Sequence, residues 1–226
     1  LIRSGSMDRF SRWYRSLEQD ELGGFEAIDP GEADFRPCYR HPRKIWGIGL
    51  NYRRHAADLE EAAPEAEPAS FMKPDTTIIG FGDTIKIPVQ SHRTTAEAEL
   101  GVVIGRECSD IREEDWLEYV AGFTPVLDMT AEDILRRNPR YLTRAKSFDT
   151  FFSFGPQLIT CDEMDNIEKI KVRTVINGGV HAENLIANMV HSPSSLVSFH
   201  SRVMTLLPGD IISTGTPGAV PLKEGD

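Results

Sequence analysis

The stretch that most constrains the fold of this chain is residues 94–105, which read TTAEAELGVVIG. The stretch is short, becomes apolar toward its end and closes on a glycine, which is typical of a β-strand. Side chains in a strand alternate between two faces, so Glu97 and Glu99 are predicted to point the same way. The opposite face is predicted to enter a hydrophobic core and comprises Ala98, Leu100, Val102 and Ile104.

Two carboxylates on one strand face repel each other, and burying them even in part is costly. A bound cation is one way to offset that cost. A strand face in contact with water is the simpler explanation, and the Glu-x-Glu pattern alone favours it because short motifs have high false-positive rates. The acidic and basic residues elsewhere in the chain must decide between the two.

Size and charge exclude several classes of protein. The chain has 226 residues, enough for one large domain or two small ones with a substantial core. A net charge of −10 argues against nucleic acid or an anionic membrane as partner, although a bound metal or a local lysine can still admit an anionic small substrate. Three widely spaced cysteines predict a reducing, cytoplasmic setting without disulfide bonds. No apolar run reaches membrane-spanning length, and no signal peptide is visible.

The chain is predicted to divide into an N-terminal arm, residues 1–43, and one domain, residues 44–226. Residues 1–6 stand before Met7 and look like a cloning remnant. Residues 7–24 have the apolar spacing of an amphipathic helix. Beyond residue 44, many short strands and few helices favour an α+β, mainly β fold over alternating βαβ units.

A candidate catalytic pair follows the first predicted strand, residues 44–50. Asn51 can cap a short helix on which His55 and Asp58 share one face. A carboxylate beside an imidazole suits a general base that takes a proton from water. A surface ion pair is the simpler alternative. Residues 60–69 are rich in Glu, Ala and Pro and predict a mobile loop, either a lid or plain surface.

Other candidate site residues are scattered along the chain. Asp128 is predicted to stand at the end of a strand, residues 120–127. Lys146 is a candidate cation, with an ordinary surface lysine as the alternative. Lys73, in a strand-like piece at residues 71–74, is a candidate for contact with the substrate. In the loop TGTP, residues 214–217, a glycine permits close approach of the backbone to a ligand and two hydroxyls are available.

Five motifs follow one another in a distinctive order: GLNYRRHAA at 49–57, EAEL at 97–100, DMTA at 128–131, AKSFD at 145–149, and PGD with TGTP at 208–217. Together they resemble the fumarylacetoacetate hydrolase family, over about residues 44–226. No single motif is decisive, but five in this order are highly specific. Relatives usually carry further strands, so we expect that the C-terminal end of the domain is incomplete in this sequence.

The resemblance implies a mixed β-sandwich roll and a divalent metal held by Glu97, Glu99 and Asp128. An all-oxygen donor set suits Mg²⁺, with Mn²⁺ or Ca²⁺ as alternatives, and disfavours zinc. Family substrates are small anionic 2-oxo acids, acylpyruvates and related diketo or dienol dioates, as in aromatic catabolism. A metal that chelates such an acid stabilises the enolate formed when a C–C bond breaks or a proton leaves. Relatives are commonly homodimers.

The resemblance also implies individual roles. His55 matches a histidine that activates water, and Asp58 stands where a longer glutamate is commoner. Lys146 matches a lysine beside the metal, and Thr216 matches a threonine that hydrogen-bonds the acid group of the substrate. Glu132 is a candidate substrate-contacting residue at a position where many relatives carry arginine.

Two departures from the family pattern bear on specificity. Glu132 and Leu135 replace the arginine and glutamine that many relatives carry. If Glu132 faces the site, it would repel a second carboxylate, so we expect a small dicarboxylate such as oxaloacetate to be a poor substrate. Hydrolysis of a C–C bond is the leading prediction for the reaction, with isomerisation or decarboxylation as alternatives. A catalytically weak protein that binds metal and ligand on the same scaffold is the alternative from a different class.

Overall fold

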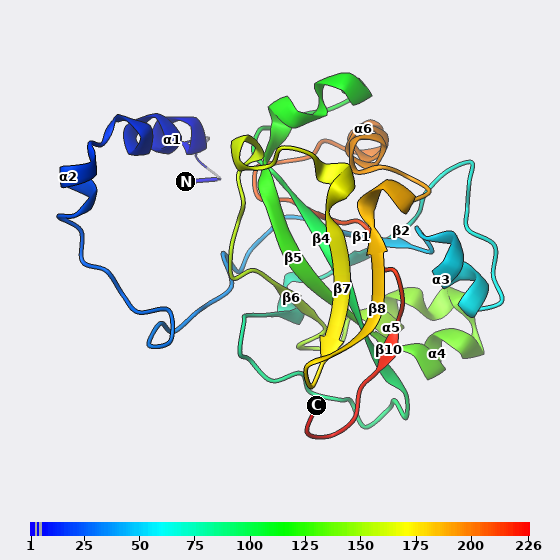
Figure 1. Ribbon diagram of the computed structural model, residues 1–226. Helices are drawn as coiled ribbons and strands as arrows, with labels where there is room; N and C mark the ends of the chain where they lie inside the picture. The colour runs from blue at the N-terminus through cyan, green and yellow to red at the C-terminus, as the bar shows by residue number, and fades with distance from the viewer. Residues whose placement is uncertain (3, 5) are drawn as a thin grey trace.

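The computed structural model describes residues 1–2, 4 and 6–226, and Figure 1 shows their arrangement. The α-helices are α1 Met7–Ser16, α2 Gln19–Leu22, α3 Arg53–Asp58, α4 Glu132–Arg137, α5 Leu142–Lys146 and α6 Pro193–Val203. The strands are β1 Ile45–Gly49, β2 Ala69–Lys73, β3 Ile78–Ile79, β4 Thr94–Ile104, β5 Val120–Ala131, β6 Phe152–Phe154, β7 Lys171–Ile176, β8 Gly179–Leu185, β9 Ile211–Ser213 and β10 Val220–Pro221. Several short 3₁₀ turns lie between them.

A mixed eight-stranded sheet forms the body of the molecule. Its strand order is β2-β1-β9-β4-β5-β6-β3, and β10 pairs with β4 beside this path. The β1–β9 and β3–β6 pairs are parallel and the other pairs are antiparallel. A separate two-stranded hairpin, β7–β8, stands across the face of β4 and β5 (Figure 1). The predicted mainly β, α+β class is confirmed.

The long antiparallel β4–β5 ladder is the centre of this sheet. All eleven residues of β4 are buried, so both of its faces are covered. In the register of the ladder, Glu97 lies opposite Asp128 and Thr95 lies opposite Thr130. The prediction that a strand ends before Asp128 is wrong, because β5 continues through Ala131. Asp128 therefore belongs to the interior of the sheet, where its position is fixed by hydrogen bonds on both sides.

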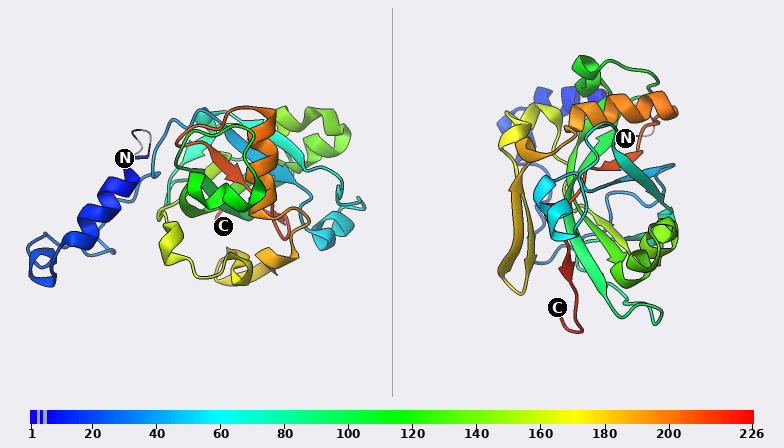
Figure 2. Two further views of the ribbon diagram at one scale, coloured as in Figure 1. Left: turned by 90° about the horizontal axis from the view of Figure 1, so that it is seen from above. Right: turned by 90° about the vertical axis from the view of Figure 1, so that its right-hand side faces the viewer.

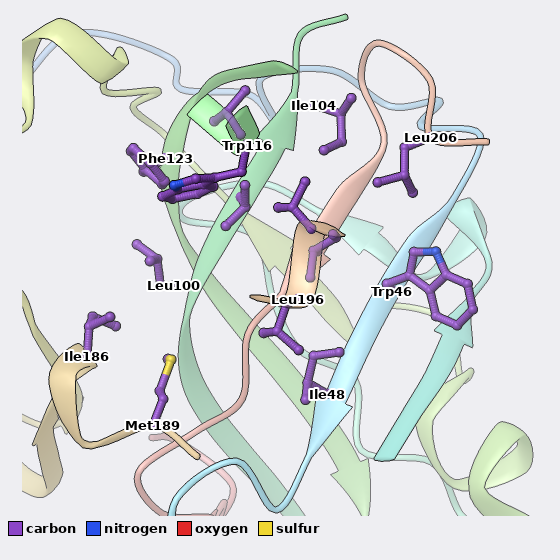
Figure 3. Packing of buried hydrophobic residues seen from close by; sticks show 14 of the residues in the cluster. Trp46, Ile48, Leu100, Ile104, Trp116, Phe123, Ile186, Met189, Leu196 and Leu206 are labelled. Atoms are coloured by element: carbon purple, nitrogen blue, oxygen red, sulfur yellow. The ribbon is translucent and has the colours of Figure 1, made fainter. Parts of the chain in front are cut away.

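The main hydrophobic core lies between the sheet and the elements that cover it. Ala98, Leu100, Val102 and Ile104 enter this core, as the alternation of β4 predicts. Helix α6 covers it from one side with Leu196, and Figure 3 shows that side chain among residues of β1 and β4. Ser192 caps α6 by accepting a hydrogen bond from the Ser195 backbone N–H.

The predicted N-terminal helix over residues 7–24 is interrupted. Leu17 adopts an extended backbone, so α1 ends at Ser16 and the short α2 follows. Both helices lie to one side of the sheet (Figure 2). An ion pair from Arg15 to Asp162 links α1 to the body of the molecule. The prediction of a cloning remnant at residues 1–6 falls partly on residues 3 and 5, which lie outside the described residues. Within the described part of the chain, no helix has the length and apolarity needed to cross a membrane.

Candidate metal centre and catalytic cleft

Three carboxylates meet at the middle of the β4–β5 ladder. One oxygen from each of Glu97, Glu99 and Asp128 lies within 4.8 Å of the others. Glu97 and Glu99 share a face of β4, and the register places Asp128 of β5 beside them. Their exposures are 8%, 4% and 0%, so the alternative of a strand face in contact with water is wrong. Three buried carboxylates at this separation require compensating positive charge.

Two buried lysines supply part of that charge. The Lys146 Nζ donates to Glu97 Oε2 at 3.0 Å, to Asp128 Oδ2 at 2.7 Å and to Thr130 Oγ1 at 2.7 Å. The Lys73 Nζ donates to Asp128 Oδ1 at 2.6 Å and to the Met129 carbonyl at 3.2 Å. Both lysines are buried, so the alternative prediction that Lys146 is an ordinary surface lysine is wrong. Lys73 is buried behind Asp128, where it orients that carboxylate.

The pKa values of the groups follow from burial and from these pairs. Burial and the Asp128 carboxylate raise the pKa of Glu99 to about 8. Burial alone would raise the pKa of Asp128, but Lys146 and Lys73 outweigh it and lower that pKa. Burial lowers the pKa of Lys73 to about 8, although Asp128 opposes the change. Burial would also lower the pKa of Lys146, but Asp128 and Glu97 outweigh it and raise that pKa.

This donor set fits a hard divalent cation. With all three carboxylates ionised, as metal binding requires, three negative charges face two ammonium groups and one negative charge is left in excess. Burial, followed by the Asp128 carboxylate, raises the pKa of Glu99, so a bound cation would favour its ionised form. Carboxylate oxygens are the ligands that Mg²⁺, Mn²⁺ and Ca²⁺ prefer in proteins. Glu97, Glu99 and Asp128 are therefore the residues that would hold such an ion.

The loop after β9 holds Glu99 in place. The Ser213 hydroxyl and the Gly215 backbone N–H, at 2.8 Å, both donate to Glu99 Oε2. Gly215 has a φ of +98°, and a Cβ there would lie 2.7 Å from the Asn51 Cβ, so only glycine suits this position. The Asn51 side chain donates to the carbonyl oxygens of Thr214 and His191 at 2.7 and 2.9 Å. The prediction that Asn51 caps α3 is therefore wrong, since Tyr52 occupies the cap position.

A cleft of about 570 Å³ opens between α3, α4, β8 and residues 217–219. Among the sequence-predicted residues, His55, Asp58 and Glu132 line it. Thr216 precedes this lining; its hydroxyl accepts from the Gly218 N–H at 3.2 Å and donates to the Gly218 carbonyl at 3.1 Å. Figure 1 shows α3 and α4 on the same side of the β4–β5 ladder. The cleft thus brings together predicted residues that are far apart in the sequence.

His55 is the candidate base of this cleft. It is buried, and burial lowers its pKa, partly opposed by the Glu97 carboxylate. Since Lys146 also acts on that pKa, His55 lies within electrostatic range of the triad. Asp58 is exposed, and it acts on the pKa of His55 through its charge and not through a hydrogen bond. The predicted pair therefore shares one cleft without being joined into a dyad.

Sequence reasoning missed the partners of Glu132. Its carboxylate accepts hydrogen bonds from Arg93 and Arg136, and all three residues line the cleft. The i,i+4 spacing of Glu132 and Arg136 on a helix was a signal that could have found one partner. Arg93 lies at an even spacing from Glu97, as a residue on the same strand face would. No comparable pattern in the sequence indicated that Ser213 would donate a hydrogen bond to Glu99.

Comparison with known proteins agrees with this geometry. The family model described as fumarylacetoacetate (FAA) hydrolase C-terminal matches residues 44–226. The chain belongs to the fumarylacetoacetate hydrolase family. A protein of Archaeoglobus fulgidus is 44% identical over 186 residues, which cover 82% of this chain and 72% of that protein.

Two solved structures of this family show the same fold. The 5-carboxymethyl-2-hydroxymuconate delta-isomerase of Mycobacterium smegmatis is 34% identical with a TM-score of 0.78, covering 89% of this chain and 78% of that one. The maleylpyruvate hydrolase of a Sphingobium species, solved with manganese(II) and pyruvate, is 27% identical with a TM-score of 0.83 and covers 100% of this chain and 78% of that one. Fumarylacetoacetate hydrolase relatives of this chain therefore include both isomerases and hydrolases.

Proposed function

We propose that this chain is a divalent-metal-dependent enzyme that hydrolyses a C–C bond of a 2-oxo acid or β-diketo acid of the acylpyruvate type. One observation carries the proposal: a buried triad of Glu97, Glu99 and Asp128 is paired with Lys146 and lies within electrostatic range of His55, which lines a cleft. Mg²⁺ or Mn²⁺ suits the oxygen donors, and the Sphingobium relative was solved with manganese.

When bound, the ion would polarise the 2-oxo oxygen of the substrate and stabilise negative charge that develops beside it. The Lys146 ammonium, which already bridges Glu97 and Asp128, adds a second positive charge at the same place. His55 takes a proton from water at an imidazole nitrogen. Its lowered pKa keeps the ring neutral and able to accept that proton at pH 7. The Thr216 hydroxyl, which donates to the Gly218 carbonyl in this structure, is proposed to turn and donate to the acid group of the substrate instead.

The net reaction adds water across one C–C bond. The hydroxyl of water goes to the acyl carbon, which leaves as a carboxylic acid. The hydrogen goes to the carbon next to the 2-oxo group, which leaves as a smaller 2-oxo acid. The proton that His55 takes from the attacking water is the one returned to that carbon.

Turnover of an acylpyruvate panel with Mg²⁺ and with Mn²⁺ tests the proposal. We expect activity in the unaltered chain and its loss in Glu99→Ala, because that change removes one carboxylate of the triad. Glu168→Ala is the matched control, since Glu168 is exposed and lies on a 3₁₀ turn away from the triad. Equal rates in the unaltered chain and Glu99→Ala would refute the proposal.

Isomerisation of a dienol dioate is a second candidate function. Two observations favour it. Asp58 acts on His55 through its charge and not through a hydrogen bond, so the base lacks an orienting partner for the activation of water. An isomerase is also among the relatives. Product analysis of one dioate substrate separates the two candidates. A single isomer of unchanged mass supports isomerisation, whereas two smaller acids support hydrolysis. Homodimer formation and a cytoplasmic location stay predictions of the sequence.

A further inference from the structure

Helix α3, which carries His55, is too short to fix its own position. It has six residues, Arg53–Asp58, and an isolated helix of that length is not stable in water. His55 and Ala56 are its buried residues. The place of the His55 imidazole in the cleft therefore depends on the contacts that hold the chain just before and just after the helix.

The chain before α3 is bound to residues 189–191. The Asn51 side chain is buried; it accepts from the His191 backbone N–H at 2.8 Å and donates to the His191 carbonyl at 2.9 Å. The Asn51 carbonyl accepts from the Val190 N–H at 2.9 Å, and Tyr52 pairs with Met189 in an antiparallel bridge. Both Tyr52 and Met189 belong to the main hydrophobic core. The start of α3 is thus fixed to a segment that the core holds in place.

The chain after α3 is bound to the ring of the same histidine. The His191 Nε2 lies 2.6 Å from the carbonyl oxygen of Pro64, in the loop between α3 and β2. Because a carbonyl oxygen can only accept, Nε2 carries the hydrogen and donates it. The loop has a second tether, an ion pair from Arg53 to Glu65 at 3.1 Å, but both side chains are 67% exposed. Exposed ion pairs of this kind contribute little to stability, so the His191 contact is the stronger one.

His191 therefore contacts the chain on both sides of α3. We propose that His191 is a positioning residue that holds α3 at both ends and thereby aligns the His55 imidazole in the cleft. Its backbone holds the start of the helix, and its ring holds the loop that follows the helix. The inference rests on the proposed function only in giving His55 the role of base. Because the backbone contacts survive a change of side chain, replacing the ring releases only the far end of the helix.

The segment that holds the start of α3 is also linked to the metal centre. The Asn51 side chain donates to the Thr214 carbonyl at 2.7 Å, and the Gly215 N–H donates to Glu99 Oε2 at 2.8 Å. Neither of these contacts uses the His191 ring. Loss of the ring should therefore loosen α3 and leave the support of Glu99, and with it the affinity for metal, unchanged.

His191→Phe keeps a planar ring and removes the donor to Pro64. In hydrogen exchange of the full chain followed by mass spectrometry, we expect residues 53–65 to exchange about fivefold faster, the effect of one net hydrogen bond, with α6 as internal reference. NMR titration of the His55 ring should give a pKa below 6.5 in the unaltered chain and nearer 6.5 in the variant, because a loosened α3 admits water. The Mn²⁺ affinity, measured by titration, should stay the same.

Two further variants complete the test. His191→Gln keeps an N–H donor in its side-chain amide, so it should restore slow exchange and the lowered pKa of His55. Arg53→Gln is the matched control, because it removes the exposed ion pair to the residue after Pro64 and should leave both readouts unchanged. If an acylpyruvate is turned over, kcat should fall about tenfold in His191→Phe and recover in His191→Gln.

The exchange rate and the pKa of His55 decide the matter together. If His191→Phe leaves either of them unchanged, the positioning role is overturned. Equal effects of His191→Phe and Arg53→Gln, or an effect that His191→Gln does not reverse, would also overturn it. Faster exchange with a raised pKa of His55, reversed in His191→Gln, supports the role even if no acylpyruvate is turned over, which would reject the proposed function alone.

Discussion

Replacing Lys146 with methionine tests whether the lysines balance the charge of the triad. The Lys146 Nζ donates to Glu97, Asp128 and Thr130, and the side chain is only 6% exposed. Removing one partner of a buried ion pair costs roughly 3–5 kcal/mol. Because Lys73 still pairs with Asp128, we expect the low end, about 3 kcal/mol of unfolding free energy for the metal-free protein. For a chain of this size that corresponds to a fall of about 6–12 °C in melting temperature.

The same substitution should strengthen metal binding. With all three carboxylates ionised, loss of the Lys146 ammonium leaves two negative charges in excess instead of one, so a divalent cation is attracted more strongly. At a metal concentration a hundred times its dissociation constant, the unaltered chain should gain about 2.7 kcal/mol of stability. We expect a larger gain at the same concentration in Lys146→Met.

Thermal unfolding with and without Mn²⁺, together with direct titration of the metal, provides the measurement. Lys169→Met is the control, because Lys169 is exposed on a 3₁₀ turn. Unchanged stability of metal-free Lys146→Met would refute the charge-balance reasoning. Weaker metal binding in that variant would show that Lys146 orients the ligands instead of competing with the metal for them.

Four further predictions concern the triad, the candidate base and the packing of the sheet. Ser213→Ala removes one of two hydrogen bonds to Glu99 Oε2, so Mn²⁺ affinity should fall about tenfold with the fold intact; an unchanged affinity would contradict the orienting role. His55→Ala should lower turnover while a metal titration stays unchanged, and loss of metal would show that His55 is a ligand. In the pH profile of kcat/KM, the midpoint of the fall on the acidic side should lie below pH 6.5. Burial and Lys146 hold the pKa of His55 below that value against the opposing carboxylates Glu97, Asp58 and Glu132, so the neutral base persists as pH falls; a limb centred above 6.5 would refute this assignment. Gly47→Ala places a Cβ 2.2 Å from the Phe71 ring and should cost about 1–3 kcal/mol of stability by denaturant unfolding, and a cost near zero would mean that β2 shifts freely.

The sequence was informative where a structural feature depends on a local pattern of residues. Alternation along residues 94–104 placed Glu97 and Glu99 on one face and the apolar side chains on the other, and the structure confirms that division. The order of five motifs identified the family, and the serine–proline start of α6 fixed its N-terminus. These features depend on neighbours within a few positions in the chain, which a sequence displays directly.

Local reasoning failed where tertiary contacts override it. Asn51 has the chemistry of a helix cap, but its side chain is used to join the loops at His191 and Thr214. The strand was predicted to end at residue 127 with Asp128 behind it, yet pairing with β4 carries β5 four residues further, through Ala131. In both cases the deciding partner is tens of residues away along the chain.

The sequence by itself determined which residues could hold a metal and which family this chain resembles. Only the tertiary structure decided their environment: that the carboxylates are buried, that Lys73 lies behind Asp128, and that Asp58 stays apart from His55. It also changed the meaning of Glu132, which carries a lone negative charge in the sequence but lies between Arg93 and Arg136 in the fold. The physical reason is that a charge acts through its neighbours in space and through its distance from water, and neither is written in the order of residues.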